Sequence, residues 1–187
     1  MTLRNVPQKD ARDQAFIHGI IEHGHMVLCV ADAVDEPTEG PPFAYSVGAF
    51  ESYGAPEVIV SGLGADLMHF MINEFMRAWK TIEKPTLGVR LSGYVEGFDV
   101  ICVEASKDAL RTHATHADWY NQRRPLPLWQ MVWSGAATGE FPWEAEADDS
   151  LLELRENLTG RRWSAWNEPA APRRGFLGVM RGLLTRH

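Results

Sequence analysis

The sequence predicts an α+β domain with a mostly antiparallel sheet flanked by helices. Two observations support this class. Short apolar runs typical of strands recur along the chain, and most are separated by Gly- and Pro-rich turns rather than by helical crossovers. The composition of the 187 residues, 45% hydrophobic and 23% charged, is that of a globular protein. The expected order is helix, three strands, helix, two strands, helix, strand.

The first half of the chain predicts a helix followed by three strands. The helix is expected over residues 8–23, with Ala15, Ile17, Ile20 and Ile21 on its buried face and Gly24 as its stop. Residues 26–34 form the first expected strand, and an acidic loop follows at 35–40. Residues 43–50 and 57–61 are expected to pair as an antiparallel hairpin with a longer turn at 52–56.

The second half predicts two helices and three strands. A helix is expected over 65–82, and its 3-4 spaced apolar stripe marks a core face. The stripe consists of Leu67, Phe70, Met71, Phe75, Met76 and Trp79. Strands are expected at 86–91 and 98–105, with turns at 92–93 and 96–97. Ser106 is a suitable N-cap for a helix over 107–120. Prolines confine the start of the last strand, 126–133, to a sheet edge or a strand end.

Composition places the domain boundary near residue 144. Residues 1–144 are predicted to form a single α+β domain, and 145–187 an acidic linker and a basic amphipathic C-terminal tail. Within the latter, 151–158 is a candidate short helix. In a helical tail, one apolar stripe edged by arginines would consist of Phe176, Leu177, Met180, Leu183 and Leu184. We expect this tail to dock on the acidic body; a protein partner and a membrane surface are the alternatives.

Charge and patterning exclude several classes of protein. The net charge of −7 argues against a broad nucleic-acid surface, because phosphate binding needs clustered cations. The first residues carry no apolar signal-peptide core, and no stretch is apolar enough to span a membrane. A cytoplasmic protein is therefore expected. Cys29 and Cys102 lie in apolar runs, which predicts two buried thiols.

Two aromatic, turn-rich segments carry a family resemblance. They are residues 42–48 (PFAYSVG) and the pair 130–133 (QMVW) and 139–143 (GEFPW), with His23-Gly24 before them. Over roughly residues 17–144 the chain resembles the bacterial family called domain of unknown function 4262. The resemblance implies a small soluble bacterial protein and no defined substrate. The chain departs from the family pattern at His25, where an aromatic is usual, and at Ser134-Gly135, where Pro-Asp is usual.

The aromatic segments also supply the candidate ligand site. Aromatic rings with a polar atom suit a surface that is part apolar and part wet, and nearby polar side chains would complete a pocket for a flat organic ligand. The candidate ligand-binding residues are Tyr45, Ser46, Glu57, Asn73, Gln130, Trp133 and Trp143. The alternative is a hydrophobic core rich in tryptophan. The prediction requires Tyr45 and Trp133 to come together in space.

Two histidine pairs are weak candidates for a metal site. His23 and His25 would share one face of a strand, and His113 and His116 would be neighbours on a helix. The first pair would need a third ligand, for which His69, His113, His116 and Glu22 are the candidates. Partly solvated histidines are the favoured explanation of both pairs, so no metal site is predicted.

These observations favour a binding module that recognises a small ligand or a protein partner through the aromatic segments and the basic tail. A homodimer is left open. One alternative is a flavin-type split-barrel cofactor protein or oxidoreductase, since residues 43–60 loosely resemble the strands of flavin-reductase split barrels; the fold prediction includes such an arrangement. A second alternative is a metal-dependent hydrolase. Cofactor and catalytic residues stay unassigned, as does enzymatic activity.

Overall fold

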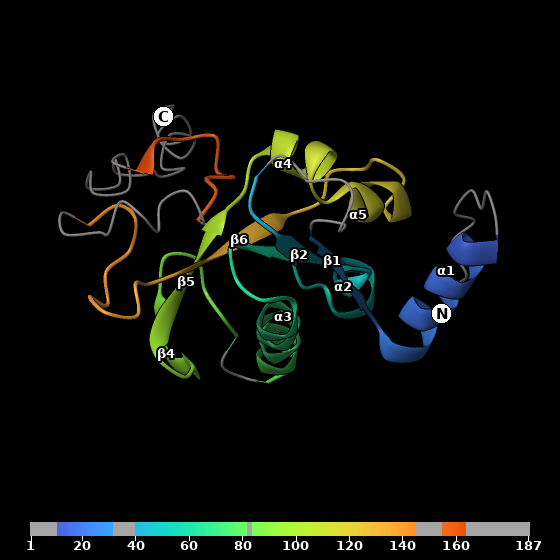
Figure 1. Cartoon of the computed structure of the whole chain (residues 1–187). Helices are drawn as coiled ribbons and strands as arrows, with labels where there is room; N and C mark the ends of the chain where they lie inside the picture. The colour runs from blue at the N-terminus through green and yellow to red at the C-terminus, as the bar shows by residue number, and fades with distance from the viewer. Residues whose placement is uncertain (1–10, 32–39, 82–83, 145–154, 164–187) are drawn as a thin grey trace, which may run out of the picture.

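The computed structural model describes residues 11–31, 40–81, 84–144 and 155–163. Here the chain forms an open six-stranded sheet and five helices (Figure 1). The helices are α1 Ala11–His23, α2 Ala49–Tyr53, α3 Ala65–Trp79, α4 Lys107–Thr112 and α5 Thr115–Tyr120. The strands are β1 Met26–Val30, β2 Phe43–Val47, β3 Glu57–Ser61, β4 Arg90–Val95, β5 Phe98–Glu104 and β6 Leu128–Trp133.

The sheet consists of two antiparallel units joined by one parallel contact. Its strand order is β1-β2-β3-β6-β5-β4, and only β3 and β6 run parallel. The predicted α+β class with a mostly antiparallel sheet is therefore confirmed. The sheet is open, because β1 and β4 lie at its two edges and do not pair. The split-barrel-like arrangement that the sequence suggested does not form.

Helices cover both faces of the sheet (Figure 1). On one face, Met71 and Phe75 of α3 belong to the same buried cluster as Val60 and Trp133 of the sheet. On the other face, α1, α4 and α5 enclose a second cluster that contains Tyr45. The 3-4 spacing of the apolar residues in α3 explains why one side of this helix is buried.

The second strand ends earlier than the sequence predicted. It stops at Val47, and residues 49–53 form α2 instead of continuing as strand to residue 50. Gly48 adopts φ 95°, a left-handed conformation that reverses the chain at low steric cost. The carboxylate of Glu57 accepts hydrogen bonds from the backbone N–H groups of Gly48 and Phe50, which holds the start of α2.

The helix predicted over 107–120 is two helices. Ser106 caps α4 as expected, because its hydroxyl oxygen accepts from the backbone N–H of Ala109 at 3.1 Å. The break follows Thr112, whose hydroxyl donates to the carbonyl oxygen of Asp108. Thr has a low helix propensity and its hydroxyl competes for backbone acceptors, so this position favours a stop. Residues 113 and 114 then redirect the chain into α5.

The last three strands also differ from expectation in detail. Residues 86–89 form a turn with Gly88 at φ 74°, so β4 begins at Arg90 and contains Gly93, which was predicted to lie in a turn. The predicted turn at 96–97 is present. Strand β6 lies in the sheet interior, and its prolines precede the first paired residue. Of the two positions that the prolines allowed, a sheet edge or a strand end, the strand end is the correct one.

Several burial predictions are wrong. Ile21 and Phe70 are 39% and 49% exposed, and Ala15 is exposed as well, so each lies outside the core face assigned to it. Cys29 is exposed in the edge strand β1, whereas Cys102 is buried as predicted. A thiol in an edge strand keeps one side toward solvent, which the apolar sequence around Cys29 does not reveal.

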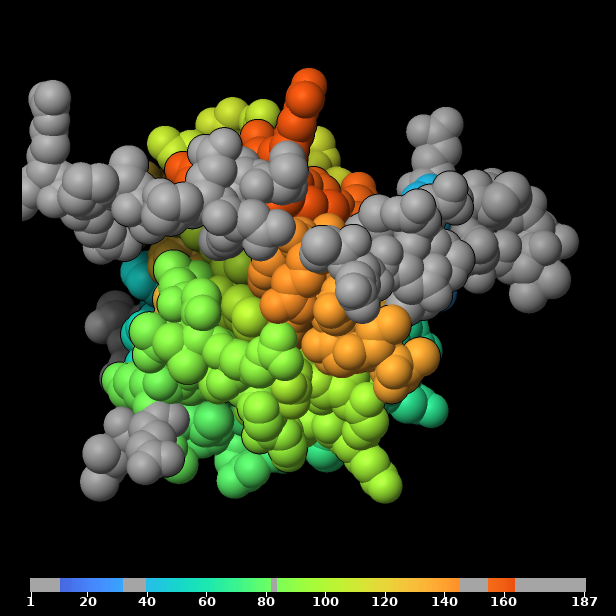
Figure 2. Space-filling view, turned by 90° about the vertical axis from the view of Figure 1, so that its left-hand side faces the viewer, coloured from blue at the N-terminus to red at the C-terminus, as the bar shows by residue number. Residues whose placement is uncertain are grey.

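Residues 155–163 pack against the body of the domain. Leu158 and Arg155 are buried, and residues 155–158 are not helical, contrary to the helix predicted over 151–158. Figure 2 shows this segment (orange-red) beside residues 134–144 (orange) and strands β4 and β5 (green). The rest of 151–158, the strand residues 32–34 and the tail 164–187 lie outside the described residues. In the described part of the chain, no helix could cross a membrane.

Candidate functional site

The candidate ligand residues are divided between the two faces of the sheet. Tyr45, Ile59 and Gln130 occupy one register row across β2, β3 and β6. Trp133 lies three residues after Gln130, so its side chain points to the opposite face, where it packs in the cluster under α3. Tyr45 packs in the other cluster. The structure therefore does not bring Tyr45 and Trp133 together as the sequence led us to expect.

Tyr45 lies under the helices that carry His113 and His116. Its hydroxyl is 3.1 Å from Nδ1 of His116, and burial raises the pKa of the phenol. The two histidines are not neighbours on one helix, because His113 ends α4 and His116 lies in α5. Nε2 of His113 lies 3.2 Å from the carboxylate of Glu156, so each histidine has a different partner.

Ser46 and Glu57 form a buried hydrogen-bonded pair. The Ser46 hydroxyl donates to Oε2 of Glu57 at 2.5 Å and accepts from the backbone N–H of Val58. The other oxygen, Oε1, accepts from two backbone N–H groups at the start of α2. Burial raises the pKa of the Glu57 carboxyl, and these hydrogen bonds act against the increase. Both side chains are fully occupied within the protein.

Asn73 of α3 connects two histidines, one directly before β1 and one in α3 itself. Its Oδ1 lies 3.0 Å from Nε2 of His25, and its Nδ2 lies 3.1 Å from Nδ1 of His69. Because the amide Nδ2 donates, Oδ1 accepts, so Nε2 of His25 carries a proton. Burial lowers the pKa of His25. His23 ends α1, as the predicted helix over 8–23 implies, and its ring is largely exposed, so the shared strand face that a His23–His25 metal site would need does not form.

The histidines do not gather into a metal centre. Among the described residues, no group of three or more His, Cys, Asp or Glu side chains lies close enough to hold a metal ion. The two histidine pairs from the sequence lie on different elements: His23 ends α1 and His25 precedes β1, whereas His113 ends α4 and His116 lies in α5.

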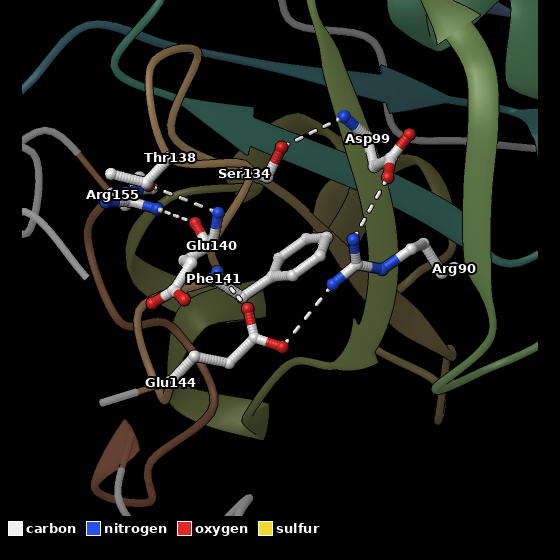
Figure 3. Close-up of polar contacts among 8 residues, drawn as sticks. All are labelled: Arg90, Asp99, Ser134, Thr138, Glu140, Phe141, Glu144 and Arg155. Carbon is white, nitrogen blue, oxygen red and sulfur yellow. Dashed lines mark hydrogen bonds and ion pairs between the residues drawn. The ribbon is translucent and has the colours of Figure 1, made fainter. Parts of the chain in front are cut away.

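The second part of the second aromatic segment, with Glu144, forms a strap of residues 139–144 beside strands β4 and β5 (Figure 3). The guanidinium of Arg90 lies 3.2 Å from Asp99 and 3.4 Å from Glu144, and it stacks over the ring of Phe141. Glu144 also accepts from the backbone N–H of Phe141 at 2.7 Å. Trp143 stacks on Phe141 with ring centroids 5.1 Å apart. These contacts hold the strap in place through side chains of the protein itself.

Gln130 and Trp133 hold backbone segments together. Oε1 of Gln130 accepts from the N–H of Leu158 at 3.0 Å, and its Nε2 donates to the carbonyl of Glu156. The indole N–H of Trp133 donates to the carbonyl of Ser61 at 2.9 Å. The guanidinium of Arg155 lies 5.1 Å from the Trp133 ring centroid and donates to the Trp133 carbonyl. Each polar atom of these two side chains thus has a partner inside the domain.

A groove lies elsewhere, between the end of β5, the helices α4 and α5, and the start of β6. It has a volume of about 660 Å³ and is lined by residues 104–107, 110–111, 118 and 123–128, which we call the α4–α5 groove. Its apolar wall includes Leu110, Pro125 and Leu126, whereas Glu104 and Arg111 supply charge. A second hollow of about 260 Å³ shares residues 104–107 and adds Thr159 and Arg161.

The rim of the groove has an unusual backbone. Gln122 and Arg123, directly after α5, both adopt φ 56°. The N–H of Arg123 donates to the carbonyl of Asp118 at 2.8 Å, and the N–H of Gln122 to that of Trp119 at 2.9 Å. These are the two bonds of a Schellman motif, in which glycine is the usual left-handed residue. A non-glycine residue in this conformation costs about 1–3 kcal/mol.

Sequence reasoning missed this groove. Its residues come from three separated stretches, and none forms a known catalytic motif. One signal was available: the run Arg123-Arg124-Pro125 places two cations directly before a turn, and Lys107 and Arg111 are spaced four apart on a predicted helix. Only the chain path after α5 brings these two pairs to one hollow.

Comparison with protein families settles the membership of the chain. A family model described as Domain of unknown function (DUF4262) matches residues 19–148, well over half of the chain. The chain belongs to this family. No curated protein and no solved structure matches it. The family region contains all six strands and the complete α4–α5 groove, whereas residues 155–163 lie beyond it.

Proposed function

We propose that the protein is a binding module for a small molecule, and that the ligand occupies the α4–α5 groove. The observation that carries this proposal is the groove itself. Its volume of about 660 Å³ lies within the range of small-molecule sites, roughly 300–1,000 Å³. Its lining combines apolar side chains with a few charged groups, which is the composition that orients a ligand while desolvating it.

The groove replaces the aromatic segments as the proposed site. Ser46, Glu57 and Gln130 make hydrogen bonds inside the domain, so binding through them would break internal contacts. Tyr45 and Trp133 lie on opposite faces of the sheet and cannot line one pocket. The basic tail lies outside the described residues and supports neither this proposal nor a protein partner.

A fragment screen by NMR with a groove-filling variant tests the proposal. Ala105 lines the groove and is half-buried, so Ala105→Phe would occupy part of its volume. We expect fragments to shift amide signals of residues 104–111 and 123–128 in the native protein and to lose that effect in Ala105→Phe. Ala137→Phe, at an exposed position outside the lining, serves as the matched control.

Two results would contradict the proposal. One is a screen in which no fragment shifts the groove amides of the native protein. The other is fragment binding that Ala105→Phe leaves unchanged although its melting temperature and amide spectrum show an intact fold. Shifts confined to the strap residues 139–144 would instead return the site to the second aromatic segment.

A further inference from the structure

We infer that the ligand of the α4–α5 groove carries a phosphate monoester, which the four basic side chains of the groove bind. This inference rests on the proposed function. The groove contains four basic residues and two acidic ones, Glu104 and Asp118, although the whole chain has a net charge of −7. The basic residues are Lys107, Arg111, Arg123 and Arg124. The groove thus concentrates positive charge in an acidic protein, as an anion site requires.

The basic side chains are not neutralised by the rest of the described chain. Elsewhere, Arg77 pairs with Glu74, and Arg90 with both Asp99 and Glu144. Within residues 11–31, 40–81, 84–144 and 155–163, no carboxylate lies within 4.0 Å of a basic group of the groove. Arg124 donates to the neutral amide oxygen of Gln122 at 3.2 Å. These cations therefore keep their capacity to bind an external anion.

The strained rim places two of these cations. A left-handed residue at both Gln122 and Arg123 turns the chain so that Arg123 and Arg124 line the groove one after the other. Glycine at position 123 would adopt this backbone with less strain but would supply no guanidinium. Strained conformations concentrate at functional sites, where surrounding structure holds them in place. The guanidinium of Arg123 is thus the group that a glycine at this position could not supply.

The remaining lining indicates what accompanies the phosphate. Arginine guanidinium groups bind phosphate oxygens in a bidentate manner, which favours phosphate over a weaker single-point anion. Glu104 and Asp118 accept hydrogen bonds, so they suit ligand hydroxyl or amino groups. Leu110, Pro125 and Leu126 offer an apolar wall for a ring. A nucleoside monophosphate or a phosphorylated ring compound combines these three properties.

Matched pairs of compounds with and without phosphate test the inference. The probes are AMP with adenosine, FMN with riboflavin, glucose 6-phosphate with glucose, and inorganic phosphate at millimolar concentration. Amide shifts and calorimetry report where and how tightly each binds. We expect at least one phosphorylated compound to bind at residues 104–111 and 122–128 at least about tenfold more tightly than its partner, because the charged contacts are lost.

Two glycine variants separate binding from folding. We expect Arg123→Gly to raise Tm, because the backbone strain is relieved. The same variant should bind the phosphorylated compound about tenfold more weakly than the native protein does. Gln122→Gly should also raise Tm but change the affinity less than Arg123→Gly does. Arg77→Ala, which removes a cation on α3 outside the groove, should leave the affinity unchanged. This combination distinguishes a binding arginine from a merely structural one.

The possible failures are distinct. If compounds without phosphate bind the groove as tightly as their phosphorylated partners, the inference is overturned and the proposed function stands. Unchanged affinity in Arg123→Gly overturns it as well. If neither the phosphorylated probes nor the fragment screen shifts any groove amide, both the inference and the proposed function fall. Binding of citrate as tightly as of phosphate monoesters would show a general anion site and also overturn the inference.

Discussion

Glu57 shows how one buried carboxylate connects two strands and a short helix. Its two oxygens accept from the Ser46 hydroxyl and from two N–H groups at the start of α2. An unpaired carboxylate in this position would carry a large desolvation penalty. The sequence presented Glu57 as a ligand-binding candidate because polar residues beside aromatic ones often line pockets. The structure gives the side chain three internal donors.

The raised pKa of Glu57 predicts a specific pH dependence. The folded state binds this proton more tightly than the unfolded state, so its contribution to stability is greatest below the ordinary Glu pKa of about 4.5 and decreases as the pH rises toward the folded-state pKa. Glu57→Gln reproduces the protonated form, with the amide donating to Ser46. We expect the stability of the native protein relative to Glu57→Gln to decrease from pH 4 upward, measured by urea unfolding.

A control variant isolates this effect from a general change in charge. Glu96→Gln removes one carboxylate from the exposed turn between β4 and β5. A native protein that gains stability relative to Glu57→Gln as the pH rises from 4 would contradict the raised pKa. If the native protein gained the same stability relative to Glu96→Gln as relative to Glu57→Gln, the change in net charge would explain the effect.

At the scale of elements, residues 155–163 pack against the sheet and the helices. They contribute the buried residues Arg155 and Leu158, and Gln130 of β6 binds their backbone on both sides of residue 157. The sequence indicated a candidate short helix over 151–158, whereas residues 155–158 are not helical. Contacts with a central strand decide its conformation instead, and such contacts are invisible to local periodicity.

Removing the Gln130 side chain should detach this segment. Gln130→Leu preserves the size and apolar character of the side chain but leaves the Leu158 N–H and the Glu156 carbonyl without their partner. Each buried group left unsatisfied costs about 1–3 kcal/mol, so we expect a loss of unfolding free energy in that range or somewhat above it. Gln14→Leu, on the exposed side of α1, is the control. A loss no greater than in Gln14→Leu would show that these bonds contribute little.

Element types were predictable where spacing and turn residues agreed. The helix α3, the Ser106 cap and the turn at 96–97 follow from local sequence. The short helix α2 was not predictable, because it depends on Glu57, which lies after it in the sequence. The groove depends on a turn that non-glycine residues make at a cost in strain. Gln and Arg rarely adopt a left-handed backbone, so sequence propensity does not predict that turn. The groove was therefore not predictable from the sequence.

At the scale of the whole molecule, the position of the C-terminal boundary is testable by truncation. The sequence placed the domain at residues 1–144, yet Leu158 joins the core that α1, α4 and α5 cover. We expect a chain ending after residue 144 to unfold at lower urea concentration than one ending after residue 163. Burial of one leucine alone corresponds to about 1.5–3 kcal/mol. Equal unfolding midpoints would place the boundary at 144.

The single parallel contact between β3 and β6 has a consequence for how the chain folds. Every other strand pair joins consecutive strands, whereas β3 and β6 are separated by α3, β4, β5 and both short helices. Closing so long a loop is entropically unfavourable until much of the intervening chain is ordered. The two antiparallel units, β1-β2-β3 and β6-β5-β4, can thus form separately, and the β3–β6 contact between them forms late. Helix α3 packs across that contact, since its buried residues share one cluster with Val60 of β3 and Trp133 of β6. The slowest event in reaching the native state would therefore also be the one that completes this core.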